Sequence, residues 1–73
     1  MSATIHVYLL EEGTDVWRPV SAEFIRNDIY RIIGEPPDET ERWEFMPGDV
    51  VRCKQQSFSD GKAGLVAYEK VAA

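Results

Sequence analysis

Cysteine and histidine are too scarce in this chain to support a disulfide or a zinc site. Its 73 residues include one cysteine, Cys53, and one histidine, His6. One cysteine cannot form an internal disulfide, and the two residues together fall short of a Cys/His zinc site. The stability of so short a chain must therefore come from apolar packing, for which it has 44% hydrophobic residues.

Motifs that carry catalysis or metal binding are also lacking. The sequence has no Gly-x-Ser-x-Gly elbow, P-loop, His-Glu-x-x-His or Cys-x-x-Cys. His6 falls on the less apolar face of an alternating segment, which is typical of a solvated strand residue. Cys53 alternates with Val51, which predicts a buried and unreactive thiol. We expect no enzymatic activity, no cofactor and no metal.

Basic clusters and long apolar runs are the remaining absences. The formal charge is −5, and residues 35–49 hold six acids against one base, Arg42. Nucleic-acid binders present clustered Lys and Arg, so nucleic acid is disfavoured as a partner, whereas an acidic surface favours basic partners. The first apolar run ends at Glu11, too soon for a signal peptide or a membrane span. With its unpaired Cys53, the protein is expected in the cytoplasm without a membrane partner.

Short strands separated by turns are predicted along a single domain, residues 1–73. Strands are expected over residues 4–10, 16–23, 50–58 and 64–71, with an Asp60-Gly61 turn joining the last two. Residues 35–44 form one long acidic loop. Pro19 indicates an edge position or a bulge, because proline cannot donate to a central ladder. An exposed edge at Pro19 would pair with its own copy, which gives a homodimer hypothesis.

Residues 21–33 have two interpretations. A helix would begin with Ser21 as its N-cap and end at Gly34. A hairpin would turn at Asn27-Asp28 and continue as a strand over residues 29–33. The isoleucines and the Asn-Asp pair weaken the helix, because both types have below-average helix propensity. The prediction is an all-β fold, a small five-stranded barrel; the alternative is an α+β fold with a helix over residues 21–33.

Three sequence elements carry a family resemblance. They are Glu-Gly-Thr-Asp-Val-Trp-Arg-Pro-Val at residues 12–20, Tyr-x-Ile at 30–32 and Trp-Glu-Phe-x-Pro-Gly-x-Val-Val at 43–51. With them the chain resembles a group of small, uncharacterised bacterial proteins, and it is broadly similar to SH3-like barrels. The resemblance implies an SH3-like barrel and favours the hairpin, but it implies no activity.

Aromatic side chains are the main candidates for function. Trp17 shares its strand parity with Ser21 and Glu23, so it points outward if Pro19 does not switch the faces of the strand, and it is a core residue otherwise. With Tyr30 and acids such as Asp15 or Glu23, it would attract a Lys- or Arg-bearing partner through cation–π contacts. A proline-rich peptide would dock on the same rings. The leading hypothesis is a non-enzymatic module that recognises a protein or peptide segment on this aromatic and acidic surface.

Arginines support the second hypothesis. Arg18 and Arg31 occupy strand positions, where we expect surface ion pairs with Glu23 or Glu44. Together with Arg52 they would alternatively anchor an anionic small molecule, making the protein a sensor or an enzyme accessory. A third hypothesis, an RNA-binding barrel, requires base-stacking aromatics beside a basic strip, and the acidic balance disfavours it.

Overall fold

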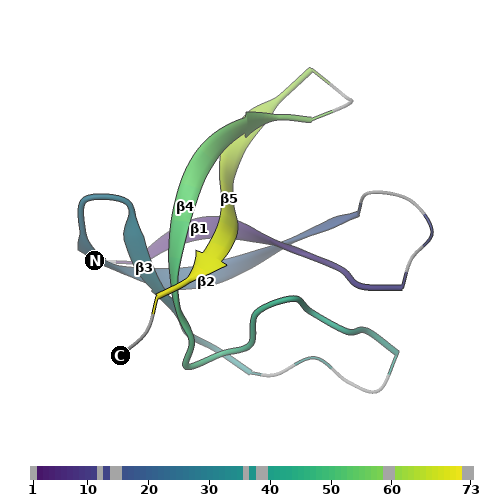
Figure 1. Cartoon of the computed structure of the whole chain (residues 1–73), viewed down its shortest axis with the longest axis horizontal. Helices are drawn as coiled ribbons and strands as arrows, with labels where there is room; N and C mark the ends of the chain where they lie inside the picture. The colour runs from purple at the N-terminus through teal and green to yellow at the C-terminus, as the bar shows by residue number, and fades with distance from the viewer. Residues whose placement is uncertain are drawn as a thin grey trace.

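A computed structural model describes residues 2–11, 13, 16–35, 37, 40–58 and 61–71. It is an all-β, closed five-stranded barrel, consistent with a small SH3-like barrel, so the fold prediction is confirmed (Figure 1). No described residue is helical, and the alternative with a helix over residues 21–33 is therefore wrong. The strands are β1 (Ser2–Tyr8), β2 (Trp17–Arg26), β3 (Ile29–Ile32), β4 (Val50–Ser57) and β5 (Ala63–Lys70).

The barrel follows the order of the chain. Each strand from β1 to β5 pairs antiparallel with the next. The barrel closes where β5 pairs parallel with β1, at His6 and Val66. In Figure 1 the β4–β5 hairpin rises above the rest, while the connection between β3 and β4 runs along the opposite side. Both strands next to β2 are thus part of the same closed sheet.

The β2–β3 hairpin turns at Asn27-Asp28. Asn27 adopts a φ of 50°, a left-handed conformation that asparagine tolerates better than most residues. The register shifts between Phe24 and Arg26, so Ile25 is the additional residue of a bulge. Of the four isoleucines that fit one face of a helix, Ile25 belongs to β2, Ile29 and Ile32 belong to β3, and Ile33 follows β3, because the Asn-Asp pair reverses the chain.

Pro19 is accommodated by its place in the ladder. Leu9 N donates to Val16 O (2.9 Å), which makes their pair a hydrogen-bonded one. Pairs alternate along an antiparallel ladder, so Pro19, opposite His6, occupies a position without hydrogen bonds to β1. Its nitrogen faces the other side of β2, where the ladder to β3 begins only at Ala22. The missing donor is harmless here, because β2 is flanked by both β1 and β3 only from Ala22 onward and Pro19 lies where β3 has not yet begun to pair.

The core is formed by the alternating residues that face inward. Ile5 and Val7 of β1 are fully buried, as is Val51 of β4. The main buried cluster also includes Val20, Ala22, Ile32, Phe45, Cys53 and Ala67. The residues that alternate with Ile5 and Val7 along β1 point outward, and other side chains gather with them on the outer face of β1 and β2.

Residues 33–49 form the long connection between β3 and β4, and it is anchored to the end of β1. Leu10 N donates to Arg42 O (2.7 Å) and Glu44 N donates to Tyr8 O (2.9 Å), on either side of a bridge between Leu9 and Trp43. Asp38 and Glu39 of the acidic loop lie outside the described residues, as do Glu12, Thr14 and Asp15 and the Asp60 of the β4–β5 turn.

Within the described part of the chain, no helix is long and apolar enough to cross a membrane.

Candidate functional site

Four rings lie in contact on the outside of the barrel, and we call them the aromatic row: His6, Tyr8, Trp17 and Phe58. The rings of Tyr8 and Trp17 meet edge to face at 5.3 Å between centroids. Trp17 lies 6.3 Å from Phe58, and Phe58 lies 5.0 Å from His6. Edge-to-face and tilted pairs at these distances are the favourable arrangements of aromatic rings. The row is therefore one continuous surface built from β1, the start of β2 and the residue that follows β4.

Strand parity places this row outside. Val7 points into the core, so its neighbours His6 and Tyr8 point outward. Trp17 is the direct cross-strand partner of Tyr8 and shares its side of the sheet. The indole is partly exposed, as its parity with Ser21 and Glu23 predicts. Phe58 joins from the β4–β5 connection, held by a hydrogen bond from its backbone N to Lys62 O (2.7 Å).

His6 is the residue that ties the row to β5. Its Nδ1 donates to the Leu65 carbonyl at 3.0 Å, because a carbonyl oxygen can only accept. A Cβ at Gly64 would lie 3.0 Å from His6 Cε1 and 3.3 Å from Phe58 Cε2. The absence of a side chain at Gly64 thus lets both rings approach the strand. His6 was expected to be a solvated strand residue, and its outward ring is only partly exposed because it packs against Phe58.

Tyr30 does not join Trp17. It packs against the buried cluster and meets Phe24 edge to face at 5.4 Å, near the β2–β3 turn. Its partner Phe24 is seven positions along β2 from Trp17, a distance of about 23 Å at the usual rise per residue. Tyr30 also follows the inward parity of Ile32, whereas Trp17 follows the outward one. The structure replaces Tyr30 with Tyr8 and Phe58 as the neighbours of Trp17.

Each arginine proposed for the site faces a carboxylate. Arg31 forms an ion pair with Glu23, its direct cross-strand neighbour, as expected. Arg52 lies 3.1 Å from Glu69 and 3.7 Å from Asp28. These pairs are exposed, so they contribute little to stability, and the anionic-ligand hypothesis for Arg18, Arg31 and Arg52 stays a prediction.

Arg18 pairs with Glu41 rather than with Glu23 or Glu44. The guanidinium contacts both carboxylate oxygens, with Arg18 Nε donating to Glu41 Oε1 at 3.2 Å and Arg18 Nη2 donating to Oε2. Trp43 Nε1 donates to Glu41 Oε1 as well, at 3.0 Å. This bidentate pair fixes the long connection to the start of β2.

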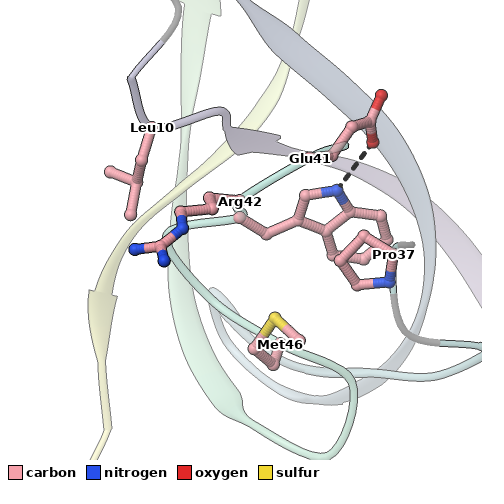
Figure 2. Close-up of a pocket in the computed structure, with 6 residues that line it drawn as sticks. Leu10, Pro37, Glu41, Arg42 and Met46 are labelled. Carbon is pink, nitrogen blue, oxygen red and sulfur yellow. Dashed lines mark hydrogen bonds between the residues drawn. The ribbon is translucent and has the colours of Figure 1, made fainter. Parts of the chain in front are cut away.

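A hollow of about 350 Å³ opens beside this pair, at the end of β1 (Figure 2). Figure 2 shows Leu10 and Arg42 on one side of it, Pro37 on the other and Met46 below. It is lined by Leu10, Pro37, Glu41, Arg42, Trp43 and Met46. The sequence offered no direct signal for it, because Leu10 and the other lining residues come from segments brought together only by the Leu9–Trp43 bridge.

Trp43 and Phe45 differ in burial. Phe45 is buried, whereas Trp43 is partly exposed, packs against the core cluster and lines the hollow. Burial raises the pKa of the Cys53 thiol to about 11, with a smaller contribution from the negative charge of Asp28. The prediction of a buried Cys53 is confirmed. Among the residues that the structure describes, no group of His, Cys, Asp or Glu could hold a metal ion.

In comparisons with protein-family models, curated proteins and solved structures, nothing matches this chain. Its function must therefore be argued from the aromatic row and the hollow themselves.

Proposed function

We propose that this barrel is a non-enzymatic binding module that recognises an extended protein segment bearing Lys or Arg side chains. The observation that carries the proposal is the position of Trp17, outside the barrel and in ring contact with Tyr8 and Phe58. Partly exposed tryptophan and tyrosine offer large apolar area with little rotamer freedom to lose on binding. The cytoplasm is its proposed location, a reducing compartment in which an unpaired cysteine such as Cys53 is ordinary.

The spacing of the row supports an extended ligand. Neighbouring centroids are 5.0 to 6.3 Å apart. Side chains on one face of an extended peptide recur at about 6.6 Å, twice the rise per residue. Successive side chains of such a peptide would therefore meet successive rings. This is the arrangement in which an extended segment gains contacts without folding.

Charge favours a basic segment over an acidic one. The chain carries a formal charge of −5, and its field attracts cationic partners at low salt. Ammonium and guanidinium groups over Trp or Tyr faces gain about 0.5–2 kcal/mol each.

The three sequence elements at residues 12–20, 30–32 and 43–51 also support membership of a family of small bacterial proteins with this barrel.

Selection from a random peptide display library tests the proposal. Wild-type protein is the bait, and the selected peptides are then titrated against Trp17→Ala. We expect sequences enriched in Lys and Arg whose affinity falls about tenfold or more in the variant, as for aromatic hot spots. The matched control is Phe24→Ala, which removes a ring that is 47% exposed at the β2–β3 end and should leave affinity unchanged.

Two outcomes decide between the alternatives. Peptides enriched in paired prolines and lost with Trp17→Ala would keep the surface but replace the basic ligand with a polyproline one. Peptides that bind both variants equally would overturn the aromatic row as the site. If Trp17→Ala fails to fold, Trp17→Leu, which keeps apolar bulk without the π face, provides the comparison.

A further inference from the structure

We propose that the hollow at the end of β1 binds a small amphipathic carboxylate, with its apolar tail against Trp43, Leu10 and Met46 and its carboxylate at Arg42. The site uses none of the residues of the aromatic row, so it can be tested independently of the peptide-binding function. It differs from the anionic site expected from the sequence, because Arg18, Arg31 and Arg52 are not the ligands.

The apolar wall comes from large side chains that remain accessible. Leu10 is 38% and Met46 is 40% exposed, and both line the same hollow with partly exposed Trp43. Other exposed hydrophobic residues such as Ile25 and Tyr68 do not line it. At about 350 Å³ the hollow is within the range of small-molecule sites, which are mainly apolar with a few polar groups.

Glu41 does not make the hollow anionic. Both of its carboxylate oxygens contact Arg18, and Oε1 also accepts from Trp43 Nε1. The ion pair is neutral as a whole, and its acceptor positions are directed at these donors. Its effect on the hollow is to fix the indole, which also lies on the Leu9–Trp43 bridge. The ligand therefore meets a wall that is already ordered.

Arg42 is the cation that a ligand would meet. Its carbonyl accepts from Leu10 N at 2.7 Å, which holds the backbone beside the hollow. Its side chain is 72% exposed, and its ion-pair partner among the described residues is Glu11, with Arg42 Nε 3.7 Å from the carboxylate and Glu11 70% exposed. That contact is longer and more exposed to solvent than the bidentate contact between Arg18 and Glu41. A ligand carboxylate would offer Arg42 the parallel pair of hydrogen bonds that guanidinium favours.

Octanoate is a suitable probe because it joins a short apolar chain to one carboxylate. In Trp17→Phe the only tryptophan is Trp43, and its emission reports on the hollow directly. We expect saturable binding of octanoate below its micellar range, with a shift of Trp43 emission. The same titration should displace the ¹³C methyl signal of Met46, measured in the wild-type chain, which contains only one other methionine.

Charge variants show whether Arg42 selects the ligand. Arg42→Gln should weaken octanoate about tenfold, the loss expected for a charge-assisted hydrogen bond. Arg31→Gln makes the same charge change on β3 and should have no effect. Octylamine should bind at least about tenfold more weakly than octanoate.

Two results would overturn the inference. Equal binding of octanoate and octylamine, unaffected by Arg42→Gln, would mean a nonspecific apolar surface. Octanoate that moves neither Trp43 emission nor the Met46 methyl signal would mean that the hollow is no binding site. Either result leaves the display selection on the aromatic row intact, because the two experiments share no ligand and no binding residue.

Discussion

Cys53 shows how the position of one residue sets its chemistry. Alternation along β4 places it in the core, opposite Ala67 of β5, where it is 2% exposed. Burial and, second, the charge of Asp28 raise its pKa from 9.0 to about 11. Both causes disfavour the thiolate, so the folded protein holds the thiol in its neutral, unreactive form.

We predict that this thiol makes stability fall at alkaline pH. The thiol of the unfolded chain loses its proton at a lower pH than the thiol of the folded protein. The stabilising contribution of the buried thiol is therefore complete below pH 9.0 and is lost as pH rises to about 11. The difference corresponds to about 3 kcal/mol in the free energy of unfolding. Urea unfolding of wild type and Cys53→Ala across this window isolates the effect. Parallel curves for the two proteins would contradict it.

Individual residues also show which features of the structure the sequence could predict. The outward position of Trp17 followed from counting along its strand, since parity is a local property. The Arg18 partner did not follow, because Glu41 reaches it only after the long connection docks against the barrel. The predicted contact between Tyr30 and Trp17 is absent for a related reason. The side of the sheet that Tyr30 faces depends on the register of the hairpin and on its bulge.

At the scale of elements, the β2–β3 hairpin is where local signals were evenly balanced. Phe24 and the isoleucines fit helical spacing, and the same residues fit two strands. The balance is decided by tertiary pairing, because β2 pairs with β1 and β3 pairs with β4, which a helix would forfeit. The hollow could not be predicted for the same reason, since its residues come from separate segments joined by the Leu9–Trp43 bridge.

Substitution of Asn27 tests the turn by the sign of its effect. Because Asn27 has a φ of 50°, Asn27→Ala should destabilise by about 1 kcal/mol, while Asn27→Gly should be neutral or stabilising. In a helix the order would reverse, since alanine is the best and glycine among the poorest helix formers. Thermal or urea unfolding of both variants measures the difference. A more stable Asn27→Ala would contradict the hairpin.

At the scale of the whole molecule, the sequence did not predict which strands pair to close the barrel. Strand number and turns predicted a barrel, and the structure closes it with a parallel pair between β1 and β5. Parallel strands need a long intervening chain, here the entire rest of the barrel, so no local pattern announces their pairing. The homodimer hypothesis stays a prediction, because residues 17–20 of β2 pair with β1 but precede the ladder to β3, which begins at Ala22.

We expect the barrel to open first at this seam. β1 pairs with β2 along its whole length but with β5 at His6 and Val66, supported by the His6–Leu65 hydrogen bond.

The Val7 amide faces β2, whereas the His6 amide faces β5, as alternation from the Leu9–Val16 bond requires. Native-state hydrogen exchange should therefore find His6 about tenfold or more faster than Val7, after correction for intrinsic rates. His6→Ala, which loses the bond to Leu65, should speed exchange of the Ala67 amide, which faces β1, while leaving that of Val7 nearly unchanged. Equal protection of the His6 and Val7 amides would instead mean that the barrel opens only by global unfolding, with the seam as strong as the hairpins.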